Sequence, residues 1–152
     1  MLSQWYPAPF SVDGVNYTTA EHFMMERKAA LFGDVDIQRE ILASTDPGKV
    51  KALGRRIRRF DNVVWNRERE AIVTRGSTEK FRQSPTLREY LETTGTKILV
   101  EASPKDTIWG IGLGKDDPAA QDPQQWKGLN LLGSCLMRAR AALLVTRPPS
   151  AA

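Results

Sequence analysis

Residues 18–32, TTAEHFMMERKAALF, carry the clearest helical pattern in the chain and decide its fold class. Apolar side chains recur there at helical spacing, and a glycine follows as a stop signal. On a helical wheel of about 100° per residue, Glu21, Met25, Lys28 and Phe32 fall within about 60° of one another. Two ionisable groups therefore share an apolar stripe and are predicted to face the body of the protein.

Two simpler explanations for Glu21 and Lys28 stay open. The stretch from Thr18 to Glu21 fits a capping box, in which the glutamate side chain returns to the N–H of the N-cap residue. A lysine at the edge of an apolar stripe often extends its ammonium group to water. Their separation is about 10 Å along the axis, too far for an ordinary surface ion pair, so they could instead bracket a ligand. The wheel places His22 and Glu26 on the opposite, polar arc.

The flanking sequence predicts a mainly helical α+β fold. Ahead of the helix, the segment PFSVDGVNY predicts a β-hairpin with a type I′ turn at Asp13-Gly14, because that turn needs positive φ. Behind it, Pro47 and Pro85 each follow capping residues and mark helix starts. The segment KILVEA is predicted as a strand over residues 97–102, and residues 115–127 as a loop long enough to be a lid. In all, helices are predicted over residues 20–32, 35–43, 47 to the arginines at 55–59, 63–81 with a weak point at Gly76, 85–92 and 130–144.

Composition restricts the chemistry that the chain can perform. Its 152 residues are 41% hydrophobic and 26% charged, which suits one compact soluble domain. Cys135 and His22 are the only residues of their types, so disulfide frameworks, Cys/His zinc sites and Cys-His or Ser-His-Asp machinery are excluded or reduced to one member. We expect no metal site, no membrane span and no targeting segment, and a cytoplasmic protein. The net charge of +4 suits an anionic ligand.

Other candidate sites each have a structural alternative. The arginines at 55, 56, 58 and 59 could bind phosphate, although a solvated helix end is the commoner meaning. The stretch WGIGLG at residues 109–114 allows close backbone approach but lacks phosphate-loop spacing. Any of the four tryptophans could stack on a base or simply pack. Asp106 could be a turn residue or a site acid.

Taken together, these segments resemble the NADAR family across nearly the whole chain. The resemblance rests on their order and spacing, not on one motif. Its pieces are SQWY at residues 3–6, the hairpin, EHFMMERK at 21–28, LGRRI, the helix around Trp65, EKFRQSPTLREYLETTG, LVEASPKDTIWGIGL and NLLG at 130–133. The resemblance implies a mainly helical α+β fold in one compact domain over residues 1–146, with a small hairpin and one or two further short strands. Residues 147–152 are expected to be a disordered tail.

The resemblance also implies an activity, which is cleavage of the N-glycosidic bond between a ribose and a base. The family lysine and glutamate fall on Lys28 and Glu21, the residues that the wheel singles out. Lys28 would attack the ribose and form a Schiff base, while Glu21 would move protons. The expected substrate-binding residues are Ser3, Trp5, Trp65, Asp106, Trp109, Gly110 and Asn130.

The expected ligand contains ADP-ribose, either attached to guanine in DNA or nucleotides or as part of an ADP-ribosylated nucleic acid. The functional counterpart would be a DNA ADP-ribosyltransferase toxin, with this chain as repair enzyme or antitoxin. Two alternatives stay open: the same chemistry on phosphoribosylamino-pyrimidine intermediates of riboflavin synthesis, and a non-catalytic module that binds ADP-ribose or NAD derivatives. None of these requires a cofactor.

Overall fold

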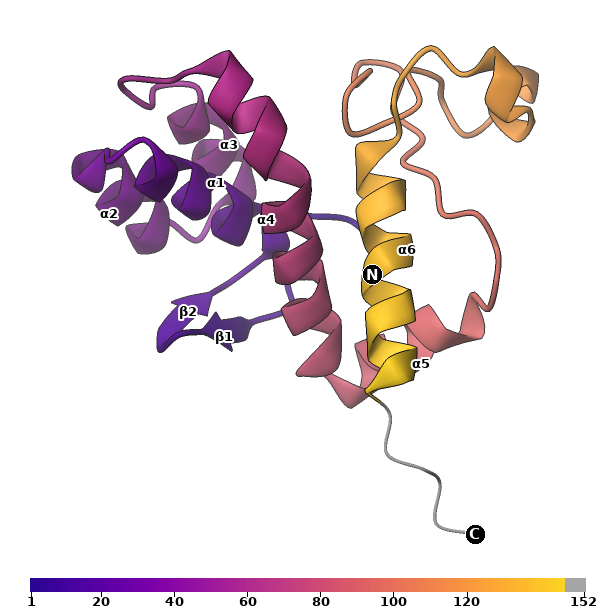
Figure 1. Ribbon diagram of the computed structural model, residues 1–152, viewed down its shortest axis with the longest axis horizontal. Helices are drawn as coiled ribbons and strands as arrows, with labels where there is room; N and C mark the ends of the chain where they lie inside the picture. The colour runs from indigo at the N-terminus through magenta and orange to yellow at the C-terminus, as the bar shows by residue number, and fades with distance from the viewer. Residues whose placement is uncertain (147–152) are drawn as a thin grey trace, which may run out of the picture. The chain divides into compact units, whose positions relative to one another are not determined.

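The computed structural model describes residues 1–146 and contains two compact units, residues 1–93 and the part from residue 94 onward. The predicted fold class, mainly helical α+β with a small hairpin, is confirmed (Figure 1). The elements of the first unit are β1 (Phe10–Val12), β2 (Val15–Tyr17), α1 (Ala20–Leu31), α2 (Val35–Ala43), α3 (Pro47–Gly54), α4 (Asn62–Arg82) and α5 (Pro85–Thr93). Those of the second are the 3₁₀ turns η1 (Pro118–Gln121) and η2 (Pro123–Gln125) and the helix α6 (Leu131–Val145).

Helix α1 is the centre of the first unit and packs against α2, α3 and α4 (Figure 1). Three of these helices begin at aspartates whose side chains accept backbone N–H bonds: Asp34 at α2, Asp46 at α3 and Asp61 at α4. Such caps satisfy N–H groups that have no partner inside the helix. The predicted starts at Pro47 and Pro85 are confirmed.

The hairpin carries an aromatic cluster onto α1. Asp13 and Gly14 both have positive φ, as the predicted turn requires. The ring of Tyr17 lies 5.6 Å from that of Phe10 and 5.0 Å from that of Phe23, measured between centroids. Helix α4 continues unbroken through the predicted weak point at Gly76. A Cβ at this position would lie 2.5 Å from Phe23 Cδ1, so the glycine makes room for the ring.

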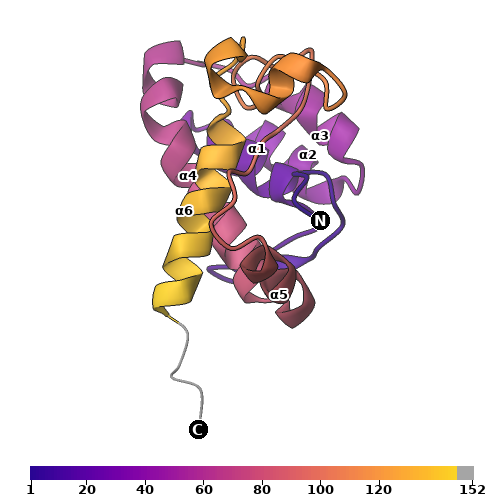
Figure 2. The same ribbon diagram turned by 90° about the vertical axis from the view of Figure 1, so that its right-hand side faces the viewer.

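Helix α6 is the one long helix of the described part of the second unit (Figure 2). Side chains at its start and along it bind extended backbone of the same unit. Asn130, in the left-handed conformation just before α6, donates to Leu99 O and accepts from Glu101 N, both at 3.0 Å. Arg140 on α6 donates to Lys97 O. The predicted strand over residues 97–102 is wrong, because these side chains, and not a neighbouring strand, satisfy its backbone.

Two other predictions concern the loop over residues 115–127 and the number of strands. The loop over residues 115–127 holds the two short 3₁₀ turns, each capped by an aspartate. Among residues 1–146, β1 and β2 are the only strands, so the one or two further strands are absent. The tail expected at residues 147–152 lies outside the described residues. No helix in the described part of the chain is long and apolar enough to cross a membrane.

Candidate active site

The first turn of α1 holds Glu21 inside the first unit. Its N-cap is Thr19, whose hydroxyl accepts a bond from His22 N. The third helical position is therefore His22, whereas the predicted capping box required Glu21 at that position. Glu21 is only 4% exposed, and its own N–H donates to Gln4 O at 3.0 Å.

Two turns further on, Lys28 lies half-buried against aromatic rings. Its Nζ donates to Gly54 O at 3.2 Å and lies 4.8 Å from the ring centroid of Phe60 and 5.3 Å from that of Trp65. Trp65, expected to bind substrate, is buried, and its ring is one of the two beside Lys28. These contacts hold the ammonium group against protein atoms, which argues against the snorkelling explanation.

Burial lowers the pKa of Lys28, because a charged amine loses its hydration there. Glu21 opposes this shift by attraction, and Arg55 adds to it by repulsion. The lowered pKa enlarges the fraction of neutral amine, which is the nucleophilic form. Glu21 and Lys28 thus act on one another electrostatically from positions two turns apart on one helix.

The loop between α3 and α4 sets the position of Phe60. Arg59, with φ of 59°, donates to the carbonyls of Phe32 and Gly33 at the end of α1. The rings of Phe32 and Phe60 meet at 5.2 Å. The aromatic wall beside Lys28 is therefore fixed by the same backbone that ends α1.

Two of the four arginines of the basic cluster bind acceptors of the protein, and Arg56 is exposed. Arg58 binds the carboxylates of Asp34 and Asp36, and Arg59 binds carbonyls as above. The bond from Arg58 also holds the pKa of Asp34 well below its usual range. Arg55 differs from these, because it is exposed and lies close enough to Lys28 to lower the pKa of that lysine.

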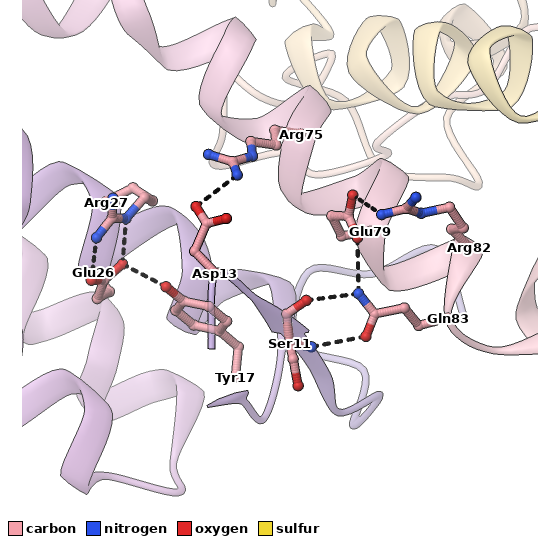
Figure 3. Close-up of polar contacts among 9 residues, drawn as sticks. All are labelled: Ser11, Asp13, Tyr17, Glu26, Arg27, Arg75, Glu79, Arg82 and Gln83. Carbon is pink, nitrogen blue, oxygen red and sulfur yellow. Dashed lines mark hydrogen bonds and ion pairs between the residues drawn. The ribbon is translucent and has the colours of Figure 1, made fainter. Parts of the chain in front are cut away.

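Pattern reasoning missed a buried carboxylate network on the other side of α1 (Figure 3). Glu26, expected on a polar arc, is 1% exposed and accepts bonds from Tyr17 Oη, from Arg27 and from Gln38. Burial opposes ionisation of Glu26, but these bonds outweigh it and lower its pKa. His22 is likewise buried, between Thr19 Oγ1 and Ser44 O. Periodicity could not reveal this, since α1 is surrounded on several sides.

The expected substrate-binding residues near the N-terminus remain accessible. Ser3 and Trp5 are exposed, and Ser3 Oγ accepts a bond from Trp5 N. The indole of Trp5 lies against the first turn of α3, since a Cβ at Gly48 would be 3.6 Å from Trp5 Cη2. Trp5 and Lys28 therefore mark opposite ends of α3, whose eight residues span about 12 Å.

The remaining candidates gather in one loop system of the second unit. Asp106 Oδ1 accepts from the backbone N–H groups of Ile108 and Trp109, so it shapes the turn that presents Trp109. Gly110 is buried, and a Cβ there would lie 2.8 Å from Asp106 O. Burial, with repulsion from Asp106, raises the pKa of Glu101. Asn130 binds backbone in the same system, as described above. Among residues 1–146, no three His, Cys, Asp or Glu side chains gather as a metal site.

Fold and site together define a class, the NADAR domain proteins. The NADAR domain profile matches residues 1–144, and the chain belongs to this family. It is 42% identical over 145 residues to an N-glycosidase of Acanthamoeba polyphaga mimivirus, covering 92% of this chain and 85% of that protein. It is 30% identical over 142 residues to a riboflavin biosynthesis protein of Vibrio vulnificus (strain YJ016), covering 93% of this chain and 35% of that protein. The NMR structure of the E. coli protein YbiA matches with a TM-score of 0.79 and 27% identity, over 99% of this chain and 83% of that one.

These similarities confirm the predicted family and its enzyme class, since relatives carry the name N-glycosidase, a hydrolase activity. The similarity to the YbiA structure confirms the fold class. The residue roles stay predictions, and the geometry around Lys28 is what bears on them.

Proposed function

We propose that this chain hydrolyses the N-glycosidic bond between a ribose and a base, with Lys28 as nucleophile and Glu21 as the group that moves protons. The observation that carries the proposal is the placement of Lys28 Nζ between two aromatic rings and one carbonyl oxygen. Burial there lowers the pKa of the amine, while the buried Glu21 lies near enough to interact with it. An amine with a lowered pKa is more often neutral, and a neutral amine can attack an electrophilic carbon.

The reaction has two halves. In the first, the Nζ–C1″ bond forms as the bond from C1″ to the base nitrogen breaks, and the base leaves with a proton donated by Glu21. The C1″–O4″ bond then opens, O4″ takes up the proton that Nζ gives up, and a protonated Schiff base remains on Lys28. In the second half, water adds to C1″ and one of its protons passes to Glu21. The remaining hydroxyl proton then moves to Nζ as the C1″–Nζ bond breaks, so Lys28 leaves as the free amine and C1″ becomes an aldehyde, to which O4″ can add again to close the ring. The sum is hydrolysis, and no cofactor is consumed.

The proposed substrate is ADP-ribose attached to guanine, in DNA or in nucleotides. A ligand with two nucleoside halves suits the about 12 Å between the two ends of α3, where Lys28 and Trp5 lie. Stacking on an exposed indole is a common way of binding a base. The net charge of +4 suits both the diphosphate and a nucleic acid. The functional counterpart would then be a DNA ADP-ribosyltransferase toxin.

A second candidate is the same chemistry on a phosphoribosylamino-pyrimidine of riboflavin synthesis. The specific observation in its favour is the similarity to the Vibrio vulnificus protein, whose name places it in riboflavin biosynthesis. A third candidate is a non-catalytic module that binds ADP-ribose, but such a module would not need the desolvated amine of Lys28.

Borohydride trapping tests the proposal. The protein is incubated with DNA carrying ADP-ribosylated guanine, borohydride is added, and the adduct is located by peptide mass mapping. We expect release of ADP-ribose and a reduced adduct on Lys28. Mapping must separate Lys28 from Lys80, the other lysine whose pKa is lowered. Turnover that survives in Lys28→Ala would refute the Schiff-base route, and tight binding without turnover would favour the module. Parallel assays with the pyrimidine rank the substrates.

A further inference from the structure

Lys80 on α4 is a buried cation that the proposed reaction does not use. It is 2% exposed, and its Nζ donates to Met1 O and Ser3 O, both at 2.9 Å. The same atom lies 5.8 Å from the ring centroid of Tyr6 and 5.1 Å from that of Phe81. Burial lowers the pKa of Lys80 to about 8, so its charge is held at an energetic cost.

Packing alone does not explain a lysine at this position. A methionine would fill similar space without losing the hydration of an ammonium group. What only the lysine supplies is a set of donors, and two of them bind carbonyls of the segment formed by residues 1–6. The function of the buried charge is therefore to be sought in that segment.

The segment is held from a second side by α1. Gln4 O accepts the bond from Glu21 N, while Ser3 O, already bound by Lys80, also accepts from Tyr6 N at 3.2 Å. Residues 1–6 thus run from the buried cation on α4 to the first turn of α1. Ser3 and Trp5, the two exposed candidates for substrate contact, lie inside this short span.

We propose that Lys80 is a positioning residue, which holds residues 1–6 so that Ser3 and Trp5 meet the substrate. This inference rests on the proposed glycosidase function. Lys80 touches no reacting atom, so its effect falls on substrate binding. The expected signature is a KM increase with a nearly unchanged kcat, because a loosened binding segment weakens substrate binding more than the chemical step.

The test compares Lys80→Met with Lys97→Met, a matched loss of one lysine at an exposed position of the second unit. We expect Lys80→Met to raise KM about tenfold with kcat within about twofold, and Lys97→Met to change neither. Amide hydrogen exchange supplies a readout that is independent of turnover. The N–H groups of Trp5 and Tyr6 should lose protection in Lys80→Met while amides in the middle of α4 keep theirs.

Every outcome of the KM and exchange measurements either supports or overturns the positioning role. Unchanged KM, or unchanged exchange at residues 5 and 6, overturns the positioning role. If the wild type itself releases no base, the proposed function fails and the inference with it, while the exchange result still reports whether Lys80 orders the segment. Should Lys80→Met not fold, Tyr6→Leu decides instead, since Tyr6 is exposed and its ring is one of the two over Nζ. Its KM should rise about threefold, and no rise overturns the proposal.

Discussion

Replacing Tyr17 by phenylalanine isolates one bond of the buried network in Figure 3. The Tyr17 hydroxyl donates to Glu26 Oε2 at 2.9 Å, and both side chains are less than 5% exposed. The ring contacts with Phe10 and Phe23 are kept in the variant. A hydrogen bond to a charged group contributes about 1.5–3 kcal/mol. Arg27 and Gln38 still satisfy the carboxylate, so we expect the lower half of that range, about 2 kcal/mol.

Urea denaturation at pH 7 measures this loss, which corresponds to a fall in Tm of about 4–8 °C for a chain of this size. Tyr90→Phe is the matched control, because Tyr90 is exposed on α5 and should change stability by less than about 0.5 kcal/mol. The folded pKa of Glu26 lies below its unfolded value. Its contribution is therefore present above the unfolded pKa and lost as the pH falls through the folded one, so the Tyr17→Phe difference should shrink in acid. A loss below about 0.5 kcal/mol at pH 7 would refute this reasoning.

Three further predictions address the amine and the backbone. Arg55→Gln removes a repulsion and should therefore raise the pKa of Lys28. The acid limb of the pH–rate profile should then move to higher pH, by a smaller amount in high salt. An unmoved limb contradicts this prediction. Gly76→Ala puts a methyl group 2.5 Å from the Phe23 ring and should destabilise by about 1–2 kcal/mol in thermal melts, although alanine favours helix elsewhere. Gly133→Ala places a Cβ 2.1 Å from a backbone carbonyl and should cost about 2 kcal/mol or more, read by hydrogen exchange in the second unit.

Local signals in the sequence predicted much of the fold. Capping aspartates and prolines set helix starts, and these signals act over a few residues, so Pro47 and Asp13-Gly14 behave as expected. The strand over residues 97–102 failed for the opposite reason. Apolar, β-favouring composition describes a segment that can be extended, but whether a strand lies beside it depends on the tertiary fold, and here Asn130 takes that place.

The candidate site could likewise be predicted only where its residues lie close together in the sequence. The wheel found Glu21 and Lys28 because both lie on one face of one helix. It could not find the rings at Phe60 and Trp65, since they come from segments more than thirty residues away. It misjudged Glu26, because a helix packed against three others has no free polar face. Lys80 had no signal at all, as its partners lie at the start of the chain.

The bonds from Lys80 to Met1 and Ser3 also bear on the order of folding during synthesis. They join residues 79 and 77 positions apart. Residues 1–6 leave the ribosome before α4 and cannot dock until most of that helix has followed them, and at about 5–20 residues per second that wait lasts several seconds. During this interval α1, α2 and α3 can pair through contacts close in sequence, which form early. Residues 1–6 are thus made before the rest of their unit but are among the last of its segments to dock.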